Sequence, residues 1–182
     1  MASLKRMKDA LERGAASAKI VAPRLGTLQG DDGDELLIDF SLLTTSSVLF
    51  DAVYLPGGTR SARALGADRD AIEFVTEAFR HCKAIAATTE GVELLRLCPG
   101  VLDSKSRGNG AGNGNEAAAD GLIVSREPAD AMLIRRFMTA IAAHRYWNRA
   151  RKNRLGGAAD DDTRGRAPIP RDRTDEGRRL QP

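Results

Sequence analysis

The sequence predicts an α/β fold in which a parallel β-sheet is covered by helices. Short runs rich in Val, Ile, Leu and Ala alternate with helical stretches along the chain. Aromatic residues are only 4% of the chain, so aliphatic side chains must form most of the core. At 182 residues and 42% hydrophobic composition, the chain can supply one ordinary domain core. We expect that single domain to occupy residues 1–150.

The chain is expected to open on a helix followed by a short strand. Leu4, Met7 and Leu11 fall on one helical face, and Gly14 is a good helix stop. The stretch "AKIVAP" then predicts a buried strand that ends at Pro23.

A hairpin and a clear strand come next. Residues 25–40 predict a small hairpin whose turn lies at Asp32 and Gly33. The clearest strand runs from Asp51 to Leu55, because proline and two glycines break the pattern directly after it.

A helix is predicted over residues 70–81. Ile72, Val75 and Phe79 share one face, and Asp70 and Glu73 stand in capping-box register.

The remaining elements are two strands and two helices. Lys83–Ala87 is expected to form a strand, and Thr89–Leu97 the helix that follows it. Residues 121–125 predict a last strand. Residues 127–149 predict a long amphipathic helix with Pro128 in its first turn. One side of this last helix carries Leu133, Phe137, Ala140, Ile141 and His144.

Two segments are too polar or too rich in glycine to pack. Residues 104–120 predict a flexible surface loop, because their glycines match no dinucleotide-binding pattern and follow no strand directly. Residues 151–182 predict a disordered tail that holds the chain's excess positive charge. Its arginines are interrupted by aspartates, so we expect no nucleic-acid binding.

Composition excludes several classes of protein. No apolar run is long enough to span a membrane and no signal peptide precedes the first helix, so we expect a cytoplasmic protein without a membrane partner. Cys82 and Cys98 have no metal-ligand spacing and are expected to be small buried thiols. His81 and His144 are expected to be solvated or hydrogen-bonded rather than metal ligands.

Four separated segments carry a family resemblance. "KIVAPRLG", "SSVLFDAVYLPGG", "EFVTEAFRHCKAIAA" and "FMTAIAAHRYWNR" together resemble the carboxyl-terminal domain of large-subunit haem catalases. The resemblance covers roughly residues 2–150. It implies a flavodoxin-like parallel sheet with helices on both faces, related to class I glutamine amidotransferases and to intracellular cysteine peptidases and deglycases.

The resemblance also implies a degenerate nucleophile elbow at Thr88, Thr89, Glu90 and Gly91. Enzymatic relatives carry a cysteine on this strand-to-helix turn, most simply at the position of Thr89. A threonine hydroxyl is a poor nucleophile without a base, and no histidine lies near it in sequence. We therefore expect no catalytic residue here and interpret Thr88 or Thr89 as a helix cap.

The family domain begins with a central β-strand that this sequence lacks. Parallel strands need partners on both sides and apolar cover on both faces, so the sheet is expected to be incomplete, with the chain a fragment of a longer product.

The resemblance assigns haem only to a catalytic core absent from this chain. Haem ligation in the family uses an R-x-x-x-Y turn, and Phe50 and Ala142 stand four residues before Tyr54 and Tyr146. We expect no cofactor and no metal in this chain.

The function implied is that of a non-catalytic accessory domain supporting a peroxide-decomposing haem catalase. Its expected partner is the haem core or a homo-oligomer, a tetramer in the family. A contact surface could be formed by Arg135, Arg136, Arg145, Tyr146 and Trp147. Alternatively, Trp147 anchors the last helix to its own sheet.

A second interpretation is a stand-alone amidotransferase-like or deglycase-like enzyme. Its site would be a shallow cleft formed by Gly57, Gly58 and Thr89 at the carboxyl ends of the strands.

Overall fold

A three-stranded parallel sheet forms the centre of the molecule. The computed structural model describes residues 1–30, 33–102 and 121–149. Strands β5 (Ala52–Leu55), β6 (Ala84–Thr88) and β7 (Leu122–Ser125) lie in the order β5-β6-β7. The chain therefore has the α/β architecture that its alternating apolar runs predict.

The middle strand explains how the sheet buries both of its faces. All five residues of β6 are buried, and successive side chains point to opposite faces. Ile85 and Ala87 pack into one apolar cluster, whereas Ala84 and Ala86 pack into another. A continuous apolar run is what a strand covered on both sides requires.

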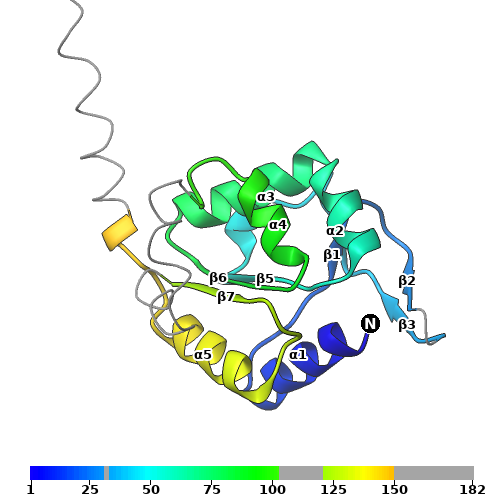
Figure 1. The fold of residues 1–182 in the computed structure, drawn as a ribbon, viewed down its shortest axis with the longest axis horizontal. Coiled ribbons are helices and arrows are strands. Elements are labelled where there is room, and N and C mark those ends of the chain that lie inside the picture. The colour runs from blue at the N-terminus through cyan, green and yellow to red at the C-terminus, as the bar shows by residue number, and fades with distance from the viewer. Residues whose placement is uncertain (31–32, 103–120, 150–182) are drawn as a thin grey trace, which may run out of the picture.

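Helices cover both faces of this sheet (Figure 1). On one face lie α2 (Thr59–Gly66), α3 (Arg69–Arg80) and α4 (Gly91–Leu97). On the other lie α1 (Ala2–Arg13) and α5 (Ala131–Ala142). The flavodoxin-like arrangement with two helical layers is thus confirmed.

Four short strands and one 3₁₀ turn lie outside the main sheet. They are β1 (Val21–Ala22), β2 (Thr27–Gln29), β3 (Glu35–Leu37), β4 (Phe40–Ser41) and the turn η1 (Ser47–Leu49). β2 and β3 form the predicted antiparallel hairpin, and β1 pairs in parallel with β4. In the predicted hairpin turn, Gly33 has a φ of +79°, which suits glycine, and Asp32 lies outside the described residues.

β5 is an edge strand among the described residues. It pairs with β6 on one side, and no strand of residues 1–30, 33–102 or 121–149 pairs with its other side. Ala52, Val53 and Tyr54 are only half-buried, whereas their partners on β6 are fully buried. The free side of β5 is therefore accessible to a further strand, and the sequence predicts an incomplete sheet.

The start of α3 differs from the prediction. The helix begins at Arg69, and the carboxylate of Asp68 accepts hydrogen bonds from the amides of Asp70 and Ala71. The predicted capping box of Asp70 and Glu73 is therefore wrong. The N-cap lies two residues earlier, at Asp68, and Asp70 belongs to the first turn of the helix.

The last helix is shorter at both ends than predicted. Asp130 is its N-cap and accepts the amide of Leu133 at 2.7 Å, so Pro128 precedes the helix and does not lie in its first turn. The helix ends at Ala142, and His144, with a φ of +65°, is exposed beyond it. The left-handed backbone at His144 ends the helix before the end of the apolar pattern from which a longer helix was predicted.

Within the described part of the chain, no helix is both long and apolar enough to cross a membrane. The predicted loop at residues 104–120 and the predicted tail at residues 151–182 lie outside the described residues.

Candidate functional site

The turn from β6 into α4 forms the predicted elbow. Thr89 has a φ of +47°, a left-handed conformation that β-branched residues rarely adopt. Its amide donates to the carbonyl of Ser125 at 2.9 Å, which holds the turn against the end of β7. A sharp, strained strand-to-helix turn of this kind is where α/β enzymes expose a nucleophile.

Neither threonine caps the helix, so that prediction is wrong. Thr88 is fully buried, and its hydroxyl shares a hydrogen bond of 3.0 Å with the hydroxyl of Tyr54. The N-cap of α4 is Glu90, and it makes no side-chain cap hydrogen bond. The left-handed backbone of Thr89 directs its side chain toward the turn after β5 instead.

Two glycines let the backbones of neighbouring turns approach closely. A Cβ added to Gly57 would lie 1.5 Å from Oγ1 of Thr89. One added to Gly91 would lie 2.5 Å from the carbonyl oxygen of Leu55. The elbow is therefore packed directly against the turn that joins β5 to α2.

Glu90 bridges these two turns with its carboxylate. Oε2 accepts the amide of Gly58 at 2.8 Å, and Oε1 accepts the hydroxyl of Thr59 at 3.3 Å. The Gly58 amide, followed by the Thr89 hydroxyl, lowers the pKa of Glu90 to about 2. The side chain is therefore an ionised carboxylate that its neighbours already bind.

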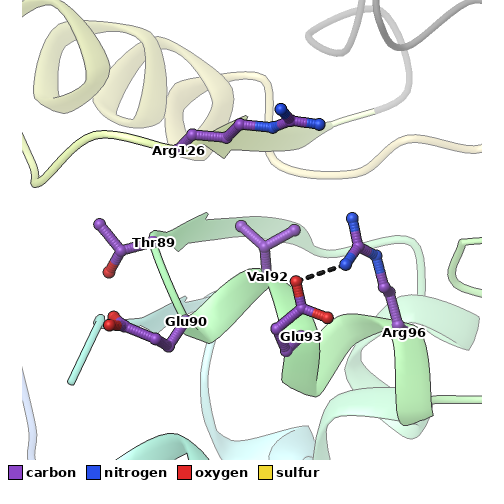
Figure 2. Close-up of a pocket in the computed structure, with 6 residues that line it drawn as sticks. All are labelled: Thr89, Glu90, Val92, Glu93, Arg96 and Arg126. Carbon is purple, nitrogen blue, oxygen red and sulfur yellow. Dashed lines mark hydrogen bonds and ion pairs between the residues drawn. The ribbon is translucent and has the colours of Figure 1, made fainter. Parts of the chain in front are cut away.

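A shallow cavity of about 490 Å³ adjoins the elbow (Figure 2). Arg96 pairs with Glu93 on one side of it, and Arg126 extends over it from the segment after β7. The cavity is lined by Thr89, Glu90, Val92, Glu93, Arg96 and Arg126.

The predicted cleft is only partly correct. Thr89 lines the cavity, but Gly57 and Gly58 do not, and the Gly58 amide is bound by the carboxylate of Glu90. Sequence reasoning missed Arg126, although its place directly after a strand was a usable signal: the carboxyl ends of parallel strands meet at one edge.

Both cysteines lie outside the elbow, as small buried thiols. Cys82 and Cys98 are free and buried, as predicted. Burial raises the pKa of Cys98 to about 11, and its thiol donates to the carbonyl of Leu94 at 3.2 Å. A protonated, enclosed thiol is unreactive.

The described residues do not fit a haem iron or a structural metal. The Tyr54 hydroxyl is engaged by Ser3 as well as Thr88, and the Tyr146 hydroxyl donates to the carbonyl of Ala140. His81 and His144 are both exposed. Across residues 1–30, 33–102 and 121–149, no group of three His, Cys, Asp or Glu side chains could hold a metal ion.

Proteins named as catalases are similar to this chain over most of its length. The chain is 37% identical over 155 residues to Catalase HPII of Mycobacterium avium, covering 79% of this chain and 20% of that protein. It is 34% identical over 146 residues to Catalase-2 of Bacillus subtilis, covering 80% of this chain and 19% of that protein. The chain therefore spans about a fifth of the length of these relatives.

Solved structures with the same fold come from a different group. Oxidized DJ-1 of Toxoplasma gondii has a TM-score of 0.61 at 16% identity, covering 85% of this chain and 89% of that one. A ThiJ/PfpI domain protein of Brachyspira murdochii has a TM-score of 0.57 at 19% identity, covering 77% of this chain and 86% of that one. At such identities the likeness shows the fold alone.

The family assignment comes from the sequence as a whole. The family model of the C-terminal domain found in long catalases matches residues 1–151, and that range contains all four segments on which the resemblance was based. The chain belongs to the family of C-terminal domains of long catalases.

Proposed function

We propose that this chain is a non-catalytic accessory domain that supports the stability and assembly of a haem catalase. The observation that carries the proposal is the filled elbow. Thr89 stands where a nucleophile would be exposed, and the carboxylate beside it is already hydrogen-bonded by Gly58 and Thr59. With a pKa of about 2, Glu90 is too weak a base to take a proton from a threonine hydroxyl.

The unpaired edge of β5 supports the proposal that the domain works as part of a longer polypeptide. Edge strands present amide and carbonyl groups that can pair with an added strand. Val53 and Tyr54 are half-buried there and would gain apolar cover from such a neighbour. A strand supplied by the polypeptide of the haem core would complete the sheet and attach the domain to that core.

Trp147 supports a contact surface next to the end of α5. The indole is 66% exposed, which contradicts the alternative that Trp147 anchors the helix to its own sheet. Arg145 lies nearby in sequence, with its guanidinium 3.7 Å from the carboxylate of Asp51. Exposed tryptophan beside arginine is typical of the centre of a protein interface.

Binding to a haem core tests this proposal directly. The core would be that of a related long catalase from which the region matching this chain has been removed. We expect the full chain to co-elute with that core, and Trp147→Ala to weaken the association by at least tenfold, about 1.4 kcal/mol or more, as for a residue at an interface centre.

Leu97→Ala is the matched control for that experiment. Leu97 is 53% exposed but lies on α4, which covers the opposite face of the sheet. We expect it to change the affinity by less than threefold. Absence of any association between wild-type chain and core would contradict the proposal, and equal effects of both substitutions would contradict the assigned surface.

A stand-alone small-molecule enzyme is the second candidate. The left-handed backbone of Thr89 and the adjoining cavity favour it, because both belong to elbows that carry chemistry. Labelling with an electrophile, followed by mass spectrometry, separates the two functions. The accessory function predicts no stoichiometric modification at Thr89 or Cys98, whereas the enzyme requires it at one of them.

A further inference from the structure

The first turn of α2 has no carboxylate of its own and no side-chain cap. Gly58 is the N-cap and has no side chain, and the first turn contains no acidic residue. The amide of Gly58 and the hydroxyl of Thr59 are satisfied by Glu90, which lies more than thirty residues later in the chain. The Glu90 carboxylate, at the start of α4, thus caps the first turn of α2.

These donors also lie where an acyl-transfer elbow would hold its substrate. In such elbows, an amide from a neighbouring strand-to-helix turn binds the oxygen that becomes negative. Gly58 belongs to the turn after β5, and β5 is the direct neighbour of β6, whose end carries Thr89. The contact between Gly57 and Thr89 places the two turns against each other.

We propose that Glu90 is a built-in plug: its carboxylate takes the donors of Gly58 and Thr59 and so closes the elbow to external carbonyl and carboxylate groups. An approaching carboxylate meets a like charge at Glu90, and the Gly58 and Thr59 donors are already engaged. Removing the Glu90 side chain leaves the Gly58 amide open to a small carboxylate. This inference concerns the elbow alone and does not rest on binding to a haem core.

Solvent access to this position comes from the adjoining cavity. Glu90 lines the cavity of about 490 Å³, and Gly58 and Thr59 are exposed residues. Arg126 lines the same cavity and contributes positive charge there (Figure 2). A small anion could therefore reach the Gly58 amide once the plug is removed, without any movement of the sheet.

Acetate titration of the full chain tests the plug. The variant is Glu90→Ala, and the readout is the amide resonance of Gly58 at constant ionic strength. We expect a saturable shift with a millimolar dissociation constant in this variant. We expect none in the wild type, because Glu90 competes from within the molecule.

Glu93→Ala is the matched control. Glu93 lines the same cavity but pairs with Arg96 rather than with the Gly58 amide. We expect it to behave as the wild type. A folded Glu90→Ala chain without a saturable Gly58 shift would overturn the proposal, and so would equal shifts in all three proteins.

A variant that fails to fold still gives an answer. If Glu90→Ala loses its dispersed spectrum, acetate should restore it beyond the effect of equal sodium chloride, because acetate replaces the missing cap. Failure of acetate to do so would overturn the proposal.

Discussion

The side chain of Thr89 leaves no space for a Cβ atom at Gly57. The left-handed backbone of Thr89 costs on the order of 1–2 kcal/mol for a β-branched residue, and its hydroxyl occupies the space where any residue other than glycine at position 57 would place Cβ. The turn therefore combines a strained backbone at Thr89 with close packing by side chains of the chain itself.

The contact predicts a compensating pair of substitutions. Gly57→Ala should destabilise the chain by about 1–3 kcal/mol, because the new Cβ meets the Thr89 side chain. Adding Thr89→Gly removes that side chain and should recover most of the loss. Urea unfolding of both single variants and the double variant measures the coupling. Additive effects would show that the two residues do not touch.

Glu90 predicts an acid-dependent stability. Its pKa is about 2 in the folded chain, below its ordinary value of 4.5, so its contribution is present above pH 4.5 and is lost as the pH falls toward 2. Glu90→Gln should therefore lower the melting temperature at pH 6, and the difference from wild type should shrink as the pH falls below 4.5. A difference that is constant from pH 6 to pH 3 would disprove the ionised cap.

At the scale of elements, the strands were easier to predict than the helix ends. β6 could be recognised because a continuous apolar run is required of a strand covered on both faces. α2 was missed because it has only eight residues, fewer than the stretch over which a helical apolar period can be recognised, and none of them is buried. The pairing of β1 with β4 was missed as well, since two-residue strands are set by tertiary contacts rather than by local pattern.

In the candidate site, too, the contacts between distant parts of the chain could not be predicted. The elbow at Thr89 could be located from the strand before it and the helix after it. Its occupation by Glu90 could not be predicted, because the Gly58 amide lies 32 residues away in sequence and is brought close only by the parallel pairing of β5 and β6. Contacts of this kind depend on register, which one sequence does not reveal.

The packing of α5 gives the element-scale prediction. Phe137 is 2% exposed and stacks at a tilt against Tyr54 with 6.3 Å between ring centroids, so Phe137→Ala should cost about 3–5 kcal/mol. Met132, on the same helix, is 58% exposed, and Met132→Ala should stay within about 0.5 kcal/mol of wild type. Denaturant unfolding compares them. Equal losses of unfolding free energy in the two variants would contradict the packing of Phe137 against the sheet.

At the scale of the whole molecule, three features agree. The chain belongs to a family of C-terminal domains and spans about a fifth of the length of the relatives described above. In the described part of the chain, β5 has a strand partner on one side only, and the turn at Thr89 is filled by the chain's own side chains. The first two support attachment to a larger protein. The third supports a contribution made by packing rather than by chemistry.

We propose that the domain acts by stabilising a haem catalase. This is tested by the half-life of peroxide decomposition on heating, measured for a related core without this region, alone and with the added chain. We expect a longer half-life with the wild-type chain, a smaller gain with Trp147→Ala, and no change in the initial rate. An unchanged half-life at saturating chain, or peroxide turnover by the chain without the core, would contradict it.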